Sequence, residues 1–580
     1  MRCHRFPARL ASVLLGLSWV SPQALGAQER PSNGAVGPPA LWLEDGSADA
    51  GLGGFSNLSG AADKPYVTDS FGAGVALLDY DGDGALDVFL VGGGSADRGG
   101  RPIGAKDGLY AGLGDGRFVE VTAEAGIERR GWSYGALAAD LDGDGWTDLF
   151  VTCRGRNTFW RNQGDGTFAD HTLAAGFAHV EWSAGAAVLD YDRDGDLDLW
   201  VVGHIDFDPQ AIDAAGPGET YLGQPVYSGP RGLPAIADRL YRNEGDGSFA
   251  DVSEQAGITS QRAPGFQAVV LDFDRDGWPD VYVANDSKPN QLWRNDGEGR
   301  FADVALITGC ALSLDGGAQA SMGVAVGDVQ GDGELDLFVT NFSEDSATLY
   351  SGQGADGFRD TTLRAGLAGP TRSSLGWAAL LLDLDQDGDL DIFSANGHVY
   401  PQMEAAREGP GYKQSDQVFE NLGAGRFAEP EGGGGPGVCV RASSRGAAAG
   451  DLDGDGDLDL VVGRLDGSPA VLFNRGAGVG AVLWVELEGK RPNTAAVGAR
   501  LVARSGDRRW ERTVGSGQGF LSGQAPGLHL GLGEIERLDE LHLTWPDGST
   551  TSMEDVPVNR RVRLRQGIGA VDLVKLEDPR

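Results

Sequence analysis

One nine-residue pattern, D-x-D-x-D-G-x-x-D, recurs through the chain and limits its fold more than any other feature. It begins at Asp79, Asp140, Asp190, Asp272, Asp328, Asp383 and Asp451, the fifth copy having Gln at the third position. Successive starts lie 50 to 82 residues apart. Chance would supply fewer than about 0.1 copies, so the pattern marks an internal repeat. A solvated acidic surface would not keep this spacing.

Each copy lies between two short apolar runs, such as residues 136–139 before a loop and residues 88–91 after one. Two such runs joined by a tight acidic loop predict a β-hairpin. Residues 240–249 then show a second signature, an aromatic strand, a Gly-rich turn and a strand led by Phe, with related copies elsewhere. Two hairpins give four strands per repeat. Seven repeats therefore predict an all-β fold, a seven-bladed β-propeller over residues 40–478.

The last repeat is one strand short. It runs through residues 471–474 and then changes composition, with no Phe-led strand after it. Residues 43–51 align with residues 118–126, which hold that strand in the first repeat. We therefore expect the N-terminal segment to complete the last blade, which would protect the edges of the first and last blades.

The acidic loops gather hard oxygen ligands, with Gly at position 6 allowing a sharp turn, and this is the ligand chemistry of calcium. An EF-hand is excluded because position 12 is never Glu and the flanks are strands, and magnesium fits less well because it prefers water-rich octahedral coordination. We expect up to seven calcium ions. The expected ligands are Asp79, Asp81, Asp83 and Asp87; Asp140, Asp142, Asp144 and Asp148; Asp190, Asp192, Asp194 and Asp198; Asp272, Asp274, Asp276 and Asp280; Asp328, Gln330, Asp332 and Asp336; Asp383, Asp385, Asp387 and Asp391; and Asp451, Asp453, Asp455 and Asp459.

The fifth loop differs from the others in charge. Gln330 replaces the carboxylate at position 3, which leaves Asp328, Asp332 and Asp336. With one carboxylate fewer, this loop is expected to be the weakest calcium site.

The loops and the Asn-x-Gly-x-Gly-x-Phe hairpins resemble the FG-GAP/VCBS propeller repeats of the integrin-α type. Residues 283–286, 321–323, 339–342 and 395–399 are also similar to the cartilage acidic protein 1-like group. This resemblance implies a secreted, calcium-binding propeller protein without a settled biochemical activity.

After Gly480 the repeat stops and a different pattern begins. Leu483, Val485 and Leu487 alternate with polar residues, as do Leu541 and Leu543. Alternation of this kind predicts a separate β-rich unit, residues 481–575. Residues 493–500, 515–523, 529–533 and 545–548 resemble the ASPIC/UnbV domain.

The first residues predict export. Three arginines precede an apolar run at residues 10–20, and small residues end at Ala27, as in a cleaved secretory signal of residues 1–27. A Pro/Gly-rich linker, residues 28–39, follows. No stretch reaches the length of a membrane span. The net charge of −38 makes a nucleic-acid partner improbable. The mature protein is expected to be secreted or to reside in the periplasm or cell envelope.

Polar residues follow the second strands of the repeats, at the end of each hairpin opposite its acidic loop. Convergent polar groups with nearby aromatic residues are typical of ligand sites, although Asn and Asp also cap turns. The candidate partner-binding residues are Arg154, His204, Asp206, Asn285, Asp286, Asn341, Asn396 and His398. An insertion at residues 204–238, rich in Pro, Gly and Tyr, is expected either to cover this face or to bind a partner.

Two classes of function remain open on these residues. The first is a calcium-binding recognition or adhesion module for an extracellular protein or glycan, which the propeller pattern favours. The second is an extracellular hydrolase or lyase in which His398 or His204 is the base and Asp286 or Asp206 its partner. No common catalytic motif supports the enzyme. A purely structural role in an envelope or matrix is a third possibility.

Overall fold

A computed structural model describes residues 39–96, 102–128, 130–208, 218–406, 409–476, 478 and 480–576. The expected signal segment and residues 28–38 of the expected linker lie outside the described residues. Within the described part the fold is all-β with little helix. The short helices are η1 (Leu52–Gly54), η2 (Val67–Asp69), η3 (Ile258–Ser260), α2 (Ala305–Thr308), η4 (Pro401–Ala405) and η5 (Glu431–Gly434).

Seven antiparallel four-stranded units follow one another along the chain, and each acidic loop joins the first two strands of a unit. Their strands are β3 (Val75–Leu78), β4 (Asp87–Leu90), β7 (Gly108–Gly112) and β8 (Phe118–Glu120); β9 (Arg130–Ala139), β10 (Asp148–Gly155), β11 (Thr158–Asn162) and β12 (Phe168–Asp170); β13 (Glu181–Leu189), β14 (Asp198–Gly203), β17 (Arg239–Asn243) and β18 (Phe249–Asp251); β19 (Gly265–Leu271), β20 (Asp280–Asn285), β21 (Gln291–Asn295) and β22 (Phe301–Asp303); β23 (Ser321–Gly327), β24 (Asp336–Asn341), β25 (Thr348–Gly352) and β26 (Phe358–Asp360); β27 (Gly376–Leu382), β28 (Asp391–Asn396), β29 (Gln417–Asn421) and β30 (Phe427–Ala428); β31 (Ser444–Gly450), β32 (Asp459–Arg464) and β33 (Ala470–Asn474), with β1 (Leu43–Asp45).

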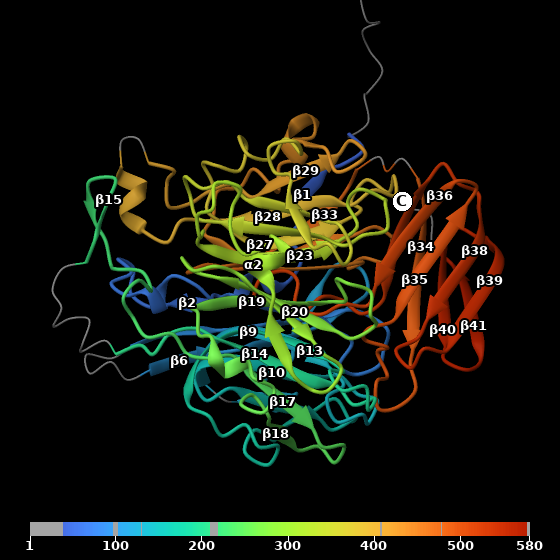
Figure 1. Cartoon of the computed structure of the whole chain (residues 1–580), viewed down its shortest axis with the longest axis horizontal. Helices are drawn as coiled ribbons and strands as arrows, with labels where there is room; N and C mark the ends of the chain where they lie inside the picture. Colours follow the sequence, from blue (N-terminus) through green and yellow to red (C-terminus); the bar gives the residue numbers. More distant parts are fainter. Residues whose placement is uncertain are drawn as a thin grey trace, which may run out of the picture. The chain divides into compact units, whose positions relative to one another are not determined.

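The strand missing from the last repeat comes from the N-terminal segment. β1 pairs antiparallel with β33, with Leu43 opposite Asn474 and Asp45 opposite Leu472, and Figure 1 shows β1 in blue beside β33. This is the pairing that the sequence alignment predicts. Residues 427 to 431 positions apart thus share one sheet, which protects the edge that β33 would otherwise expose.

Successive units pack through their first strands. β3 contacts β9, and the series continues through β13, β19, β23 and β27 to β31, which contacts β3 in turn. The second and third units also share strand pairing, because Arg154 of β10 lies opposite Trp182 of β13. A further extension of that sheet comes from β2 (Leu58–Ser59), β5 (Gly93–Ala96) and β6 (Pro102–Lys106).

Within residues 218–238 the insertion contains a small hairpin, β15 (Thr220–Tyr221) and β16 (Gln224–Pro225). Two of its tyrosines bond to the seven-unit part of the chain. The Tyr227 hydroxyl donates to Ser70 Oγ at 2.6 Å, and the Tyr221 hydroxyl lies 3.0 Å from Ser343 Oγ. The insertion therefore packs against the strand ends opposite the acidic loops.

The chain from Ala481 to Lys575 forms two four-stranded sheets around one core, drawn orange to red in Figure 1. Leu483, Val485, Leu541 and Leu543 are at most 1% exposed, in agreement with their alternation in the sequence. The strands are β34 (Ala481–Glu488), β35 (Arg500–Ser505), β36 (Arg508–Thr513), β37 (Leu528–Gly533), β38 (Arg537–Thr544), β39 (Thr550–Pro557), β40 (Arg560–Arg565) and β41 (Gly569–Lys575).

One segment of the C-terminal part, residues 515–525, enters the space between the first strands of the units. The Ala447 amide donates to the Gly519 carbonyl at 2.9 Å, and the Gly523 amide donates to the Val75 carbonyl at 2.9 Å. The Leu521 amide donates to Gln267 Oε1 at 2.6 Å. We call this segment the plug. Its contacts satisfy backbone groups of first strands that have no neighbouring strand on that side.

Aromatic rings fill the same central space. Phe71 stacks on Tyr134 at 4.6 Å and on Trp182 at 4.9 Å between ring centroids. Phe520 of the plug packs edge-on against Trp377 at 4.9 Å. All five rings are at most 2% exposed. The aromatic residues at the starts of the first strands therefore form a core, rather than an open ring around a ligand.

Candidate metal centres and the opposite face

The aspartate at position 9 of each acidic loop holds the loop against its own unit. In the first loop, Asp87 Oδ2 accepts from the Tyr80 amide at 2.8 Å and Oδ1 accepts from the Gly112 amide of the third strand at 2.9 Å. The same two bonds occur in all seven loops. Both oxygens of this carboxylate thus already have backbone donors.

The glycine at position 6 gives each loop its turn. Its φ is positive in every copy, from +87° at Gly277 to +104° at Gly388, a conformation that side chains other than glycine's rarely adopt. In five loops its amide donates to Oδ2 of the position-1 aspartate, at 2.8 to 3.2 Å. The other oxygen of the position-1 carboxylate, Oδ1, takes no part in this bond.

Several oxygens of the position-1 aspartates are buried without a hydrogen-bond donor. Among the described residues, Oδ1 of Asp140, Asp190 and Asp272 and both oxygens of Asp383 lack a hydrogen bond. A buried carboxylate oxygen without a donor is costly, and a cation removes that cost. In at least five of the loops three carboxylates place ligand atoms within 4.8 Å of one another. Orphaned oxygens and an all-oxygen donor set fit a hard divalent cation.

Burial also changes the acidity of the position-9 carboxylates. Desolvation raises the pKa of Asp87 and Asp336 to about 7, of Asp148 and Asp280 to about 8, and of Asp198 to about 9. Their ionised form is therefore unfavourable in the folded chain unless positive charge lies close by. The loops are arranged so that a bound cation would relieve this cost.

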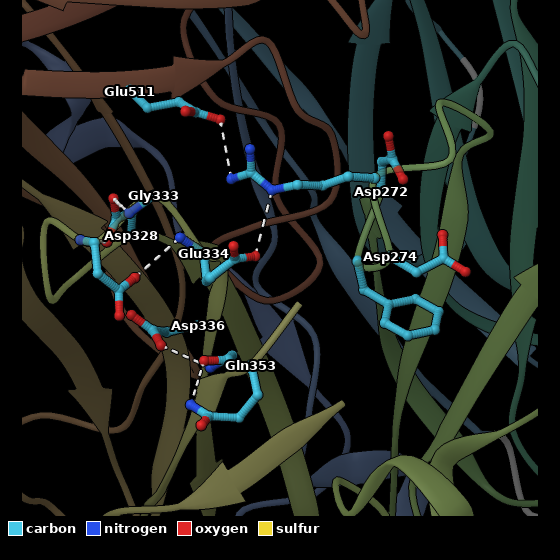
Figure 2. Close-up of polar contacts among 12 residues, drawn as sticks. Asp272, Asp274, Asp328, Gly333, Glu334, Asp336, Gln353 and Glu511 are labelled. Atoms are coloured by element: carbon cyan, nitrogen blue, oxygen red, sulfur yellow. Dashed lines mark hydrogen bonds and ion pairs between the residues drawn. The ribbon is translucent and has the colours of Figure 1, made fainter. Parts of the chain in front are cut away.

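Loop five differs from the other loops in the side chain at position 3. Gln330 Nε2 donates to Asp336 Oδ1 at 3.0 Å, so the amide bonds within the loop. Figure 2 shows Asp328 beside Gly333 and Glu334. Arg275 of loop four lies between the two glutamates, with Nε 3.3 Å from Glu334 and Nη2 3.6 Å from Glu511. Loops four and five are thus linked to the C-terminal sheets through one arginine.

Arginines that the motif did not reveal contact three of the loops. Arg294 lies 2.7 Å from Asp274 and 3.3 Å from Asp276, and Arg475 lies 2.7 Å from Asp453. Arg161 pairs with Asp142 in the same way. These arginines lie at the end of the third strand, beside the asparagine that the repeated hairpin signature carries. Loops two, four and seven therefore have less net negative charge than the motif alone suggests.

That asparagine connects neighbouring units. Asn295 Nδ2 donates to the carbonyl of Tyr191, in the loop of the preceding unit, at 2.8 Å. Four further asparagines make the equivalent bond at 2.7 to 2.9 Å: Asn162, Asn243, Asn421 and Asn474. The hairpin signature shows the asparagine, but its partner lies 82 to 104 residues away in sequence.

Side chains of the C-terminal sheets reach three position-1 aspartates. Thr494 Oγ1 donates to Asp140 Oδ2 at 2.6 Å, and Arg561 Nη2 lies 3.1 Å from Asp451 Oδ2. Arg512 Nη2 lies 3.9 Å from Asp383 Oδ2. No local pattern in the sequence marks these three residues as neighbours of the loops.

On the opposite face, all three candidate asparagines are buried and bond to turns at the strand ends. Asn285, Asn341 and Asn396 are at most 2% exposed, and their Nδ2 groups donate to the carbonyls of Pro289, Ser346 and Ser415 at 2.8 to 3.0 Å. In the described structure these side chains cap turns.

Both candidate histidines are fully buried. His204 Nδ1 lies 2.9 Å from the Gly265 carbonyl, and His398 Nδ1 accepts from the Tyr400 amide at 3.1 Å. Burial lowers the pKa of His204 to about 4 and that of His398 to about 3. Both imidazoles are therefore neutral at physiological pH and closed to solvent.

The three remaining candidates line two separate hollows. Asp286 lines a cavity of about 500 Å³ with Tyr221, Phe342 and Tyr400. Arg154 and Asp206 line a second hollow of about 590 Å³, where Arg154 lies over the rings of Trp132 and Phe207. The structure does not bring all eight candidates into one site.

Comparison with known proteins assigns both parts of the chain. FG-GAP-like repeats match residues 79–151, 140–201, 236–283, 272–339, 328–394 and 383–462, and an ASPIC and UnbV domain matches residues 489–571. The chain belongs to the FG-GAP repeat family. This confirms the resemblance seen in the loops, in the hairpins and in the C-terminal segment.

Curated relatives are named cartilage acidic protein 1. The protein from Homo sapiens is 30% identical over 53% of this chain and 44% of its own length, and that from Mus musculus is 30% identical over 53% and 45%. The Xenopus tropicalis protein is 29% identical over 48% and 42%. The matched segment thus spans less than half the length of these relatives.

Solved structures show weaker likenesses. BBS1N in complex with ARL6DN has a TM-score of 0.40 at 10% identity, covering 76% of this chain and 99% of that one. The BP39L lectin from Burkholderia pseudomallei has a TM-score of 0.39 at 12% identity, covering 70% of this chain and 97% of that one.

Among the described residues, no helix has the length and apolar character needed to cross a membrane.

Proposed function

We propose that this chain is an exported, calcium-binding seven-bladed β-propeller that recognises an extracellular protein or glycan. The observation that carries the recognition role is the cavity of about 500 Å³ lined by Asp286, Tyr221 and Phe342. It lies where residues after the second strands meet the insertion, at the ends of the hairpins remote from the acidic loops. A concave site with aromatic walls and a few polar groups is the usual form of a ligand site.

The contacts among the units support the propeller. The first strands touch in chain order and the seventh touches the first, while β1 supplies the outer strand of the last unit. Seven units of four strands connected in this way match the architecture of a propeller.

The carboxylate clusters support calcium as the ion. Aspartates supply most of the ligands, and the orphaned oxygens of Asp140, Asp190, Asp272 and Asp383 leave positions for a cation. Calcium accepts six to eight oxygens with flexible geometry, which a nine-residue loop of this composition can provide. The fifth loop, with Gln330 bonded to Asp336, is proposed as the weakest site.

Export is proposed from the N-terminal sequence and from the cartilage acidic protein 1 relatives. A secreted or envelope location would supply calcium at levels that weak loop sites require. Adhesion or recognition in that compartment agrees with the integrin-like repeats.

The alternative enzyme is less well supported by the geometry. A general base must reach its substrate, but His204 and His398 are both 0% exposed and burial lowers their pKa to about 4 and about 3. Their proposed partners, Asp206 and Asp286, line different hollows.

The test is capture of partners from envelope and culture extracts on immobilised residues 28–580 in calcium, with elution by EDTA. Asp286→Asn and the double variant Tyr221→Ala/Phe342→Ala are run beside the wild type. We expect a specific partner that the wild type retains and the variants do not. Equal retention by all three proteins would discard the site, and a calcium titration with no bound ion would discard the metal assignment.

A further inference from the structure

The cavity opposite the acidic loops has aromatic walls that are held in place. Tyr221 from the insertion packs edge-on against Phe342, with ring centroids 5.8 Å apart and an interplanar angle of 88°. Tyr400 lies 5.7 Å from Tyr221 and 4.9 Å from Tyr227. Tyr221 and Phe342 are both partly exposed, so ring surface remains open to the cavity. Such rings offer flat apolar faces at little entropic cost.

Charged groups of both signs surround these rings. The cavity is lined by four acidic residues, Glu219, Asp286, Glu344 and Asp345, and by two arginines, Arg231 and Arg372. The positive charge of Arg231 acts to lower the pKa of Asp286 and of Asp345, although burial outweighs it and raises the pKa of Asp286 to about 6. The Ser287 hydroxyl donates to Asp286 Oδ1 at 2.9 Å, which leaves Oδ2 for another donor.

These groups narrow the class of ligand. A wholly apolar molecule would desolvate charged groups without replacing their hydrogen bonds. An anion would be repelled by the excess of carboxylates. A simple cation could pair with the carboxylates but could not accept hydrogen bonds from the two arginines. A neutral polyhydroxylated ring can donate to the carboxylates, accept from the guanidinium groups and lay its apolar face on an aromatic ring.

We propose that this cavity binds a sugar residue of an extracellular glycan, with Phe342 or Tyr221 under the sugar ring and Asp286 accepting from its hydroxyls. This inference rests on the proposed recognition function and names its ligand class. The cavity of about 500 Å³ lies within the size range of small-molecule sites, so it would accept one end of a glycan rather than a polysaccharide chain.

The direct test uses calcium-loaded residues 28–580 and free sugars: glucose, galactose, mannose and N-acetylglucosamine, with lysine methyl ester and acetate as charged probes. Saturation-transfer NMR detects binding and calorimetry measures Kd. We expect at least one neutral sugar to bind, and Phe342→Ala and Asp286→Asn to weaken it at least tenfold. Phe342→Tyr should retain binding because the ring is preserved. Asp206→Asn, a carboxylate of the other hollow, is the matched control and should leave Kd unchanged.

If lysine methyl ester or acetate binds and none of the four sugars does, the sugar assignment is overturned. A second arm treats the captured partner with periodate or with protease before it is offered to the protein. Loss of capture after periodate supports the inference. Capture that survives periodate, is lost after protease and still depends on Asp286 would overturn the sugar ligand while the recognition function stands. Absence of any Asp286-dependent capture would overturn both.

Melting curves of each variant show whether the fold is intact. Because Asp286 and Phe342 are only partly buried, both variants are expected to melt close to the wild type. Should Phe342→Ala unfold, the comparison of Asp286→Asn with Asp206→Asn decides the result alone.

Discussion

The plug is expected to contribute to stability, because the ring of Phe520 is buried in the core of the seven units. Phe520 is 0% exposed and packs edge-on against Trp377 and Phe266, with ring centroids 4.9 Å and 5.8 Å away. Replacing a buried Phe by Ala costs about 3–5 kcal/mol through lost transfer free energy and the cavity left behind. We therefore expect Phe520→Ala to lower the free energy of unfolding by about that amount.

The backbone adds a second, more specific expectation. Phe520 and Leu521 have φ values of +52° and +56°, in the left-handed region that costs an ordinary residue about 1–2 kcal/mol. Phe520→Gly removes the same ring but also relieves this cost. The glycine variant should consequently be about as stable as the alanine variant or more stable by up to about 1 kcal/mol, the reverse of the order in a helix or strand.

Urea unfolding of calcium-loaded residues 28–580, followed by tryptophan fluorescence, measures both differences. Leu363→Ala is the control, because Leu363 is 77% exposed and its loss should change the free energy by less than about 0.5 kcal/mol. A Phe520→Ala protein that unfolds with the wild type would refute the plug as a source of stability. If the glycine variant has a clearly lower free energy of unfolding than the alanine variant, the argument from backbone strain at Phe520 is refuted.

Three further outcomes are expected. Gln330→Asp should tighten calcium binding to the fifth loop, measured by titration, and an unchanged isotherm would count against the loop assignment. Asn295→Leu should cost about 2–3 kcal/mol in urea unfolding, because it leaves the Tyr191 carbonyl and the Gly297 amide without their partner; a cost below about 0.5 kcal/mol would show that the bridge between units is dispensable. Burial lowers the pKa of His398 to about 3, so the unfolded chain, with a histidine pKa near 6.5, binds more protons below that pH. Stability is thus lost as pH falls from 6.5 towards 3, and His398→Gln should remove about 2 kcal/mol of the loss between pH 7 and pH 5; identical pH profiles would contradict this.

Much of the loop assignment could be read from local sequence because its determinants are local. The aspartates at positions 1, 3, 5 and 9 and the glycine at position 6 lie within nine residues of one another, and the turn they form depends on that glycine's positive φ. Alternation of Leu483, Val485, Leu541 and Leu543 likewise places these residues in a core. Such features repeat in every copy and do not depend on distant contacts.

For the candidate partner-binding residues opposite the acidic loops, local sequence was not enough to predict which ones line a cavity. Asn285, His398 and Asp286 all lie at or just past the end of a second strand, but the first two are buried and bonded while Asp286 lines a cavity. The difference depends on what the insertion and the neighbouring unit place beside each residue. Tyr221, which forms one wall, bonds to Ser343 across 122 positions of sequence.

By itself, the sequence determined the repeat, the acidic loops and the family, since each depends on residue types at short spacing. Only the tertiary structure decided that residues 515–525 enter the centre of the seven units, where Gln267 accepts a hydrogen bond from Leu521, 254 positions away. It also decided which carboxylates meet Arg275, Arg512 and Arg561. These pairings arise from packing between distant segments, and hydrophobic or charge patterns along the chain do not specify which distant partner a side chain meets.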